Sequence, residues 1–155
     1  MTDFGVLIRK MTQAACEGDG AGVAACFTED GVYHDVFYGS FEGRGRIAEM
    51  INDYFYRDAC NFRWDIHDPV SDGETGYCRY LFSYESKLGD AKKTRTMFEG
   101  VVIATLQDGL IVSYTEVANT APGLRRMGFA ADRLARFAEK QGAELAVRKD
   151  AEGHL

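Results

Sequence analysis

The stretch FTEDGVYHDVFYGSFEGRGRIAEMINDYF, residues 27–55, contains the segments around which the rest of the chain is expected to fold. Its pattern predicts a short strand near 32–37, a glycine-broken loop and an amphipathic helix that begins at about Arg44. The strand ends in Asp35. A carboxylate at the end of an apolar strand costs free energy unless something compensates it, because removal from water disfavours the charged form. Asp35 is therefore the first candidate for a functional residue.

The residues before this stretch predict two helices. Apolar side chains recur every three or four positions on one stripe, as expected for a helix that ends at Gly18. Asp19 can cap a second short helix. The stripe consists of Phe4, Leu7, Ile8, Met11 and Ala15.

After residue 60 the apolar residues alternate with a period of two, which predicts four long strands joined by short turns. The pair Asp108-Gly109 is the strongest hairpin signal in the chain. A two-residue turn there pairs Leu106 with Ile111 and Val102 with Thr115. In this register Phe98, Val102 and Asn119 face the helices, whereas Glu99, Tyr114 and Glu116 lie on the outer face. The predicted strands are 61–68, closed by Pro69, then 76–86, 93–107 and 110–119.

Helices followed by a run of long strands predict an α+β domain with one curved antiparallel sheet wrapped on the helices as a cone. Such a cone encloses a pocket. We expect residues 1–121 to form this domain. After Pro122 and Gly123 the pattern predicts a helix over 124–148, so residues 122–155 are expected to be a helical extension packed on the same domain or contacting a partner chain.

Composition restricts the function classes. The net charge is −6; residues 1–122 hold 19 acidic and 11 basic side chains, so the body lacks the basic surface that nucleic acids require. The N-terminus has no long apolar run, and neither a signal peptide nor a membrane span is expected. Four cysteines without a C-x-x-C pair, together with three histidines, give no metal-site pattern. We expect a cytoplasmic protein with reduced cysteines and no metal.

GRGRIA, residues 43–48, matches the G-x-G-x-x-A pattern of dinucleotide-binding loops. The glycines begin several residues after the strand, and the rest of the chain is a meander of strands instead of alternating strands and helices. The context of a nucleotide site is thus missing. No cofactor is expected.

Three segments together resemble the nuclear transport factor 2-like superfamily, which includes ketosteroid isomerases, polyketide cyclases and limonene epoxide hydrolase-like enzymes. They are EGDGAGVAACFTEDGVYHD at 17–35, the G-x-x-x-I-x-x-x-I pattern at 43–51, and LQDGLIVSYTEVANTA at 106–121. The resemblance implies the cone-shaped fold and places Asp35 where the isomerases have their general base. The two oxyanion donors of the isomerases correspond to Met11 and about Val102, which cannot donate hydrogen bonds. The final-strand aspartate of the epoxide hydrolases corresponds to Asn119.

These substitutions contradict the isomerase and epoxide hydrolase mechanisms. They contradict least a polyketide cyclase-like enzyme, which needs one carboxylate in an apolar cavity. We expect a cofactor-independent proton transfer of isomerase, cyclase or dehydratase type on a small hydrophobic carbonyl-bearing molecule. The alternative is a non-catalytic module that binds a small ligand or dimerises. Asp35 is the catalytic candidate, and His34 is a second one if a bulge turns it inward, because strand alternation points it away. The candidate substrate-binding residues, each of which could instead be plain core or a strand-end contact, are Met11, Tyr33, Phe37, Phe55, Trp64, Phe98, Val102 and Asn119.

The outer face of the predicted hairpin is too apolar to remain in water. We expect a homodimer through this face, with Glu99 and Glu116 in ion pairs at its surface. The apolar residues assigned to it are Met97, Val101, Ile103, Val112 and Tyr114.

Overall fold

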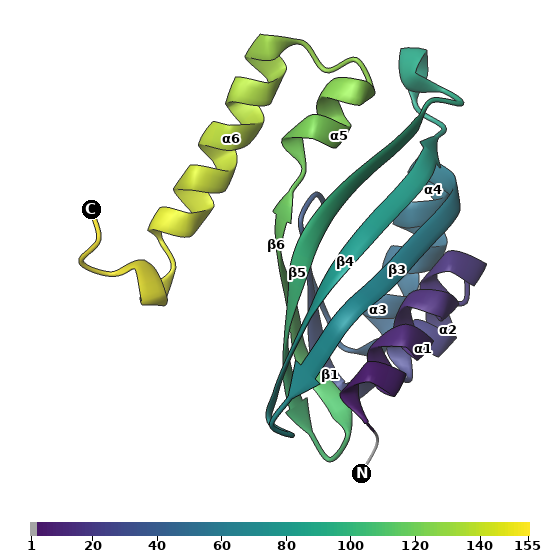
Figure 1. Ribbon diagram of the computed structural model, residues 1–155, viewed down its shortest axis with the longest axis vertical. Helices are drawn as coiled ribbons and strands as arrows, with labels where there is room; N and C mark the ends of the chain where they lie inside the picture. The colour runs from purple at the N-terminus through teal and green to yellow at the C-terminus, as the bar shows by residue number, and fades with distance from the viewer. Residues whose placement is uncertain (1–2) are drawn as a thin grey trace.

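The computed structural model describes residues 3–155 and has N-terminal helices, a curved, unclosed sheet and a C-terminal helix (Figure 1). The predicted α+β class is confirmed. The helices are α1 (Phe4–Glu17), α2 (Gly20–Ala24), α3 (Arg44–Glu49), α4 (Tyr56–Asp58), α5 (Ala121–Arg126) and α6 (Ala131–Ala146), with a π-helical segment over Met50–Phe55 and 3-10 turns at Gly89–Ala91 and Lys149–Ala151. The strands are β1 (Phe27–Asp35), β2 (Gly39–Glu42), β3 (Ala59–Ser71), β4 (Thr75–Ser86), β5 (Arg95–Gln107) and β6 (Leu110–Asn119).

The six strands form one sheet in the order β2-β1-β6-β5-β4-β3. All neighbours are antiparallel except β1 and β6, which run parallel, so the sheet is mixed where an antiparallel one was expected. The glycine-broken loop predicted between β1 and the helix at Arg44 is also wrong in part, because it contains β2. Gly39 has a φ of 89° and lets the chain reverse after β1. This reversal pairs Asp35 with Gly39 and His34 with Ser40.

The N-terminal helices follow the predicted pattern. The apolar stripe of α1 is buried, and Ile8 and Met11 have no exposed surface. The helix ends at Gly18, whose φ is 74°. The side chain of Asp19 caps α2 by accepting a hydrogen bond from the amide of Gly22 at 2.8 Å. In Figure 1 these helices cover one face of the sheet, and the core lies between them.

The hairpin of β5 and β6 begins as predicted and then departs from the predicted register. Both turn residues have positive φ, 52° at Asp108 and 76° at Gly109, and Leu106 pairs with Ile111. A bulge at Val112 then shifts the pairing by one residue, so that Val102 lies opposite Glu116 and not opposite Thr115. Because alternate residues face opposite sides of a strand, this single insertion inverts the assignment of β6. Tyr114 and Glu116 face the helices, and Val117 and Asn119 face outward.

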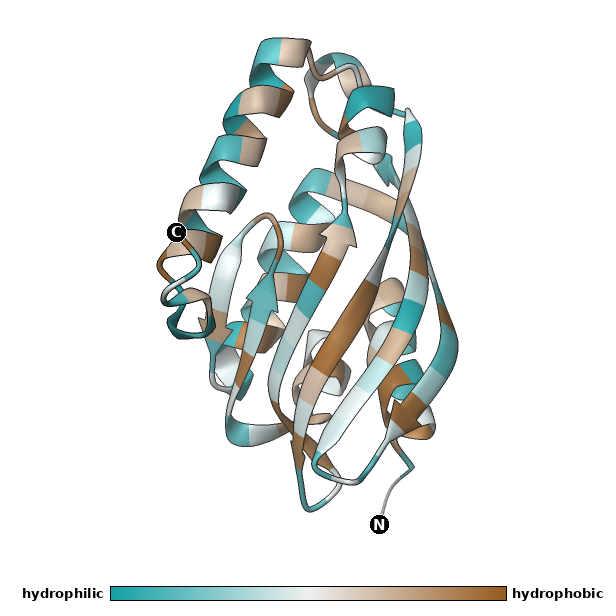
Figure 2. Ribbon diagram, turned by 60° about the vertical axis from the view of Figure 1, so that its left-hand side comes forward, coloured by the Kyte–Doolittle hydropathy of each residue, from teal (hydrophilic) through white to brown (hydrophobic). Residues whose placement is uncertain are grey.

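The C-terminal segment packs on the domain through α5. The hydroxyl of Thr96 donates to the carbonyl oxygen of Gly123 at 2.7 Å, and Leu124 is buried. Helix α6 has no buried side chain, and Phe137 contacts Phe37 with ring centroids 5.8 Å apart. Figure 2 shows hydrophilic and hydrophobic residues alternating along α6. This helix is therefore amphipathic but lies mostly in solvent.

A membrane-spanning helix, a cluster of metal ligands and a disulfide are all absent from the residues from 3 onward. No helix there is long and apolar enough to cross a membrane. No group of three or more metal-ligating side chains occurs within this range. All four cysteines are free thiols, and Cys26 and Cys78 are buried.

Candidate active site

A cavity of about 200 Å³ lies among the sheet, the end of the π-helical segment, α4, and α5 with the residues after it. Aromatic rings form most of its wall, and its carboxyl groups are those of Asp35, Asp58 and Glu116. Neighbouring rings contact each other closely, since Trp64 and Phe82 have centroids 4.8 Å apart. The interior is thus apolar apart from a few acids and hydroxyls.

Asp35 enters this cavity from the end of β1. Its Oδ2 accepts two backbone hydrogen bonds, from the amide of Phe37 at 2.8 Å and from that of Tyr38 at 3.0 Å. Burial raises the pKa of Asp35 to about 6, and the two amides keep it from rising further. Its Oδ1 has no hydrogen-bond partner among residues 3–155, which leaves one oxygen of the carboxylate able to take a proton.

Glu116 reaches the same cavity from β6, the strand parallel to β1. The hydroxyl of Tyr80 donates to its Oε2 at 3.0 Å, and the hydroxyl of Tyr114 donates to its Oε1. Burial raises the pKa of Glu116 to about 7. The nearby charge of Asp35 acts in the same direction as burial, whereas the hydrogen bonds from the two hydroxyls oppose the rise. Two carboxyl groups with pKa values near neutrality therefore share one apolar cavity, an arrangement typical of acid–base sites.

Three buried tyrosines support this pair of acids. Tyr33 and Tyr114 are register partners in β1 and β6, and their rings stack with centroids 4.4 Å apart. Burial raises the pKa values of Tyr33, Tyr80 and Tyr114 above their usual range. These phenols remain protonated at neutral pH and can act only as neutral donors or acceptors.

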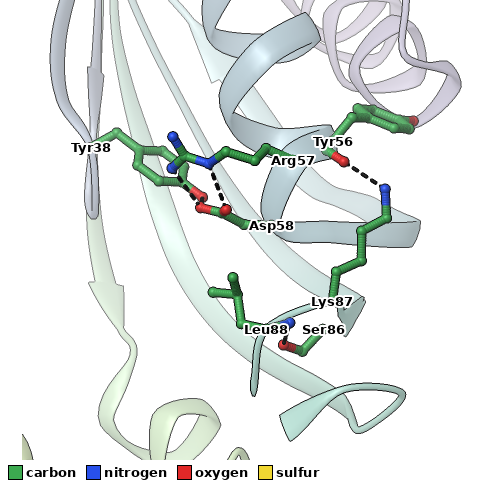
Figure 3. Close-up of polar contacts among 7 residues, drawn as sticks. All are labelled: Tyr38, Tyr56, Arg57, Asp58, Ser86, Lys87 and Leu88. Carbon is green, nitrogen blue, oxygen red and sulfur yellow. Dashed lines mark hydrogen bonds and ion pairs between the residues drawn. The ribbon is translucent and has the colours of Figure 1, made fainter. Parts of the chain in front are cut away.

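Polar contacts of a different kind surround the cavity at α4 and at the end of β4 (Figure 3). The hydroxyl of Tyr38 donates to Oδ2 of Asp58 at 2.7 Å, and Nε of Arg57 donates to Oδ1 of Asp58 at 2.7 Å. The guanidinium of Arg57 holds the pKa of Asp58 below its usual range. Nζ of Lys87 donates to the carbonyl oxygen of Tyr56 at 2.6 Å. Asp58 is thus an ionised, paired carboxylate, unlike Asp35 and Glu116.

The structure brings most of the predicted site residues together but places four of them elsewhere. Met11 and Val102 are completely buried in the core and do not line the cavity. The predicted residues that line the cavity are Tyr33, Asp35, Phe37, Phe55, Trp64 and Phe98.

His34 and Asn119 lie on the other face of the sheet. His34 pairs in register with Ser40 without a bulge, and its Nδ1 lies 2.6 Å from the Ser40 hydroxyl. The bulge that would have turned His34 inward is absent from its pairing with β2. The expectation that Asn119 faces the pocket is wrong, because the Val112 bulge turns it outward opposite Glu99.

Sequence reasoning missed Glu116, Tyr80 and Tyr114. Glu116 and Tyr114 were assigned to the outer face together because they share one side of β6. The sequence does contain one signal: Tyr114 and Glu116 are two residues apart, as are Tyr33 and Asp35. The two segments therefore match residue for residue if their strands pair side by side. Only the parallel pairing of Tyr33 with Tyr114 makes this match visible.

The fold and the site define a nuclear transport factor 2-like domain with an acid-containing apolar cavity. The chain belongs to the SnoaL-like domain family, whose match spans residues 8–114. The predicted resemblance is confirmed. No curated protein matches the chain.

Similar solved structures share this fold at low sequence identity. A protein of ketosteroid isomerase-like fold from Catenulispora acidiphila, crystallised with trimethylamine, is 16% identical, with 81% of this chain and 95% of that one covered and a TM-score of 0.72. A protein from Xanthomonas campestris assigned to the polyketide cyclases is 19% identical over 80% and 96% of the two chains, with a TM-score of 0.65. An LEH-like epoxide hydrolase from Mycobacterium tuberculosis is 17% identical over 89% and 93%, with a TM-score of 0.63.

Proposed function

We propose that this protein is a cofactor-independent enzyme that moves a proton on a small hydrophobic molecule bearing a carbonyl group. One observation carries the proposal: Asp35 and Glu116 share an aromatic cavity in which the pKa values of both are raised toward neutrality. A general base works best when its pKa lies near the operating pH. The polyketide cyclase and epoxide hydrolase neighbours support catalysis by this fold in general.

Asp35 is the base in this mechanism. With a pKa of about 6 it is mostly ionised at neutral pH, and its Oδ1 can take a proton from the carbon next to a bound carbonyl group. The electron pair of the broken C–H bond moves to the carbonyl oxygen as an enolate. In a β,γ-unsaturated ketone this enolate is conjugated with the C=C bond, so return of the proton from Asp35 to the γ carbon moves the C=C bond next to the carbonyl group and completes an isomerisation.

Glu116 and Tyr80 stabilise the developing oxyanion. At a pKa of about 7, part of the Glu116 population is protonated at neutral pH. When Glu116 carries its own proton, it no longer needs both tyrosine donors, and Tyr80, which lines the cavity, can direct its hydroxyl hydrogen to the ligand. Such donors are typically worth about 10²–10³ in rate. Strands β4 and β6 would thus supply the donors that positions 11 and 102 lack.

The isomerisation of cyclohex-3-enone to cyclohex-2-enone tests the proposal, because the conjugated product absorbs in the ultraviolet. We expect Asp35→Asn to lower the rate by at least about 10²-fold, as for loss of a general base. Asp30→Asn is the matched control, since Asp30 is an exposed aspartate on the same strand. A wild-type rate equal to that of buffer, or an unchanged rate in Asp35→Asn, would contradict the proposal.

A non-catalytic ligand-binding module is the second candidate, because the cavity wall is mainly apolar and suited to holding a small molecule. Trp64 is the only tryptophan in the sequence and lines the cavity, so its fluorescence reports ligand binding directly. Binding of cyclohex-3-enone without turnover in the wild-type protein would favour this second function.

We also propose a cytoplasmic homodimer. Unpaired, partly buried cysteines suit a reducing compartment. A second copy is the proposed occupant of the outer sheet face, where exposed apolar residues adjoin across three strands and Val101 is the register partner of Val117. These residues are Tyr77, Leu81, Met97, Val101 and Val117, each at least 37% exposed.

A further inference from the structure

Positive charge gathers where three segments of the cavity wall meet the surface. The segments are 56–59 at α4, 86–94 between β4 and β5, and 123–129 at α5. Together they hold six basic and two acidic side chains in a chain whose net charge is −6. We call these basic residues, all exposed, the basic rim: Arg57, Lys87, Lys92, Lys93, Arg125 and Arg126.

The basic rim adjoins the mouth of the cavity. Leu88 lines the cavity although its side chain is 55% exposed, so the cavity reaches the surface there. Lys87 lies between two lining residues, Ser86 and Leu88. In the same way Arg125 and Arg126 follow the lining residue Leu124 and precede Met127, which also lines the cavity. Figure 3 shows Leu88, just after the end of β4, near Asp58 of the Arg57–Asp58 pair. The side chain of Lys87 turns to the other side, toward the carbonyl oxygen of Tyr56.

Most of this positive charge is not neutralised. Lys87 donates to the carbonyl oxygen of Tyr56, Arg125 to that of Phe129 and Arg126 to that of Arg95. Within residues 3–155, Arg57 is the member of the basic rim that forms an ion pair, with Asp58. The second acid of these segments, Asp90, is exposed and makes no ion pair in that range. The rim therefore presents a net positive charge to a ligand that enters.

Glu116 lies at a different depth from the rim, whereas Asp58, another carboxyl group of the cavity, lies at the rim itself and is paired with Arg57. Tyr80, which contacts Glu116, and Ser86, at the mouth, are six residues apart on β4, a separation of about 20 Å along an extended strand. The cavity is thus negative or acidic inside and positive at its mouth. An anionic group is repelled by the inner carboxylates and attracted by the rim, whereas an apolar body prefers the aromatic interior.

We propose that the substrate is an amphipathic organic anion, with its carboxylate or phosphate at the basic rim and its apolar, carbonyl-bearing part beside Asp35 and Glu116. This inference rests on the proposed function, because it assigns the charge of the molecule on which the same cavity acts. The electrostatic field of the rim then favours one direction of entry, and Lys87 contributes to this field from outside the cavity wall.

Titrations of Trp64 fluorescence at pH 7 and low salt test this with four ligands of equal chain length: octanoate, octyl phosphate, methyl octanoate and octylammonium. We expect at least one of the two anions to bind at least fivefold more tightly than the ester, and octylammonium to bind more weakly than the ester. The preference should shrink at 300 mM salt, because ions screen exposed charges. If neither anion exceeds the ester, or if octylammonium binds best, the inference is overturned.

Variants of the rim provide the second part of the test. Lys87→Glu, and Lys87→Gln as the milder change, should reduce the affinity for the preferred anion at least fivefold and twofold, respectively, with methyl octanoate changed less than twofold. Lys149→Glu is the control, because Lys149 is exposed at the far end of the chain and outside the rim. Equal losses in the Lys87 and Lys149 variants, or equal losses for anion and ester, overturn the inference.

Failure of this inference is distinguishable from failure of the proposed function. The isomerisation assay uses cyclohex-3-enone, a neutral molecule that does not need the rim. Turnover of cyclohex-3-enone without a preference for anions overturns only the proposal that the substrate is negatively charged. A protein that binds anions selectively but leaves cyclohex-3-enone unchanged contradicts the proposed catalysis, and with it the role of the anion as substrate.

Discussion

The hydroxyl of Tyr80 occupies the space that a side chain would fill at Gly100, its register partner on β5. A Cβ atom at Gly100 would lie 2.7 Å from this hydroxyl oxygen and 2.9 Å from the carbonyl oxygen of Val117. Because position 100 has no side chain, Tyr80 can lie across β5 and reach Glu116 on β6. Gly100 is thus a positioning residue for the acid pair.

We therefore expect Gly100→Ala to displace Tyr80 and break its hydrogen bond to Glu116. Loss of a donor to the carboxylate should raise the pKa of Glu116 above about 7, since this bond favours the charged form. Tyr80→Phe should raise the pKa in the same direction. A carbon-13 NMR titration of the glutamate carboxyl groups measures this change.

Gly142→Ala is the control for this prediction, because nothing lies within 4 Å of a Cβ at Gly142 on the exposed helix α6. This change should leave the pKa of Glu116 unaltered and stabilise α6 by about 0.5–1 kcal/mol. Gly100→Ala should instead destabilise the fold by about 1–3 kcal/mol through overpacking. An unchanged titration in Gly100→Ala would show that Tyr80 is not held by this contact.

The raised pKa values of the two acids predict that stability falls as pH rises. The pKa of Asp35 rises from 3.8 to about 6 on folding, and that of Glu116 from 4.5 to about 7. The folded state then binds more protons than the unfolded state, so stability is highest at or below about pH 4 for these groups and is lost progressively up to about pH 7.

Neutral isosteres should remove this dependence. We expect Asp35→Asn and Glu116→Gln to be more stable than the wild-type protein at pH 7.5, each by about 1–3 kcal/mol, and to lose this advantage at pH 4. Urea unfolding at the two pH values measures the difference. A variant that is destabilised equally at both would show that hydrogen bonding to Phe37 or Tyr114, and not desolvation, dominates at that acid.

The elements on either side of the site followed from the sequence because their causes are local. The α1 stripe ends at Gly18, and the Asp108-Gly109 turn adopts the positive φ angles that this pair favours. Asp35 could be recognised for the same reason, since it is a carboxylate at the end of an apolar strand and its apolar neighbours lie on the same short segment. Part of the aromatic wall was also predicted, namely Tyr33, Phe37, Phe55, Trp64 and Phe98.

The other half of the acid pair could not be predicted, because its cause is not local. The bulge at Val112 carries no glycine or proline signal, yet it inverts the faces of the rest of β6. The parallel pairing of β1 with β6 then brings Glu116 beside Asp35 across some 80 residues of chain. Sheet topology, which depends on the packing of the whole domain, decides the chemistry of this site.

The bulge also predicts which substitution would separate a dimer. It turns Val117 outward, where it is 65% exposed and pairs with Val101. If a second copy covers this face, Val117→Lys places a charge in an apolar interface and should convert the dimer to a monomer. Size-exclusion chromatography with light scattering measures the mass.

Val147→Lys is the matched control, since Val147 is 85% exposed just after α6. It should leave the mass unchanged. A wild-type monomer would contradict the dimer altogether. A dimer that survives Val117→Lys and dissociates in Val147→Lys would contradict an interface on the sheet and favour one through the C-terminal helix.

Helix α6 offers a last prediction, because one aromatic contact, Phe137 on Phe37, joins it to the wall of the site. We expect Phe137→Ala to lower the free energy of unfolding by less than about 1 kcal/mol, since no side chain of α6 is buried. Phe27→Ala, at a core position with no exposed surface, should cost about 3–5 kcal/mol. Hydrogen exchange should be faster in α6 than in β5 in the wild-type protein. Slow exchange in α6, with a large loss of stability in Phe137→Ala, would mean that the helix is covered in solution, and the partner copy would then be the surface that covers it.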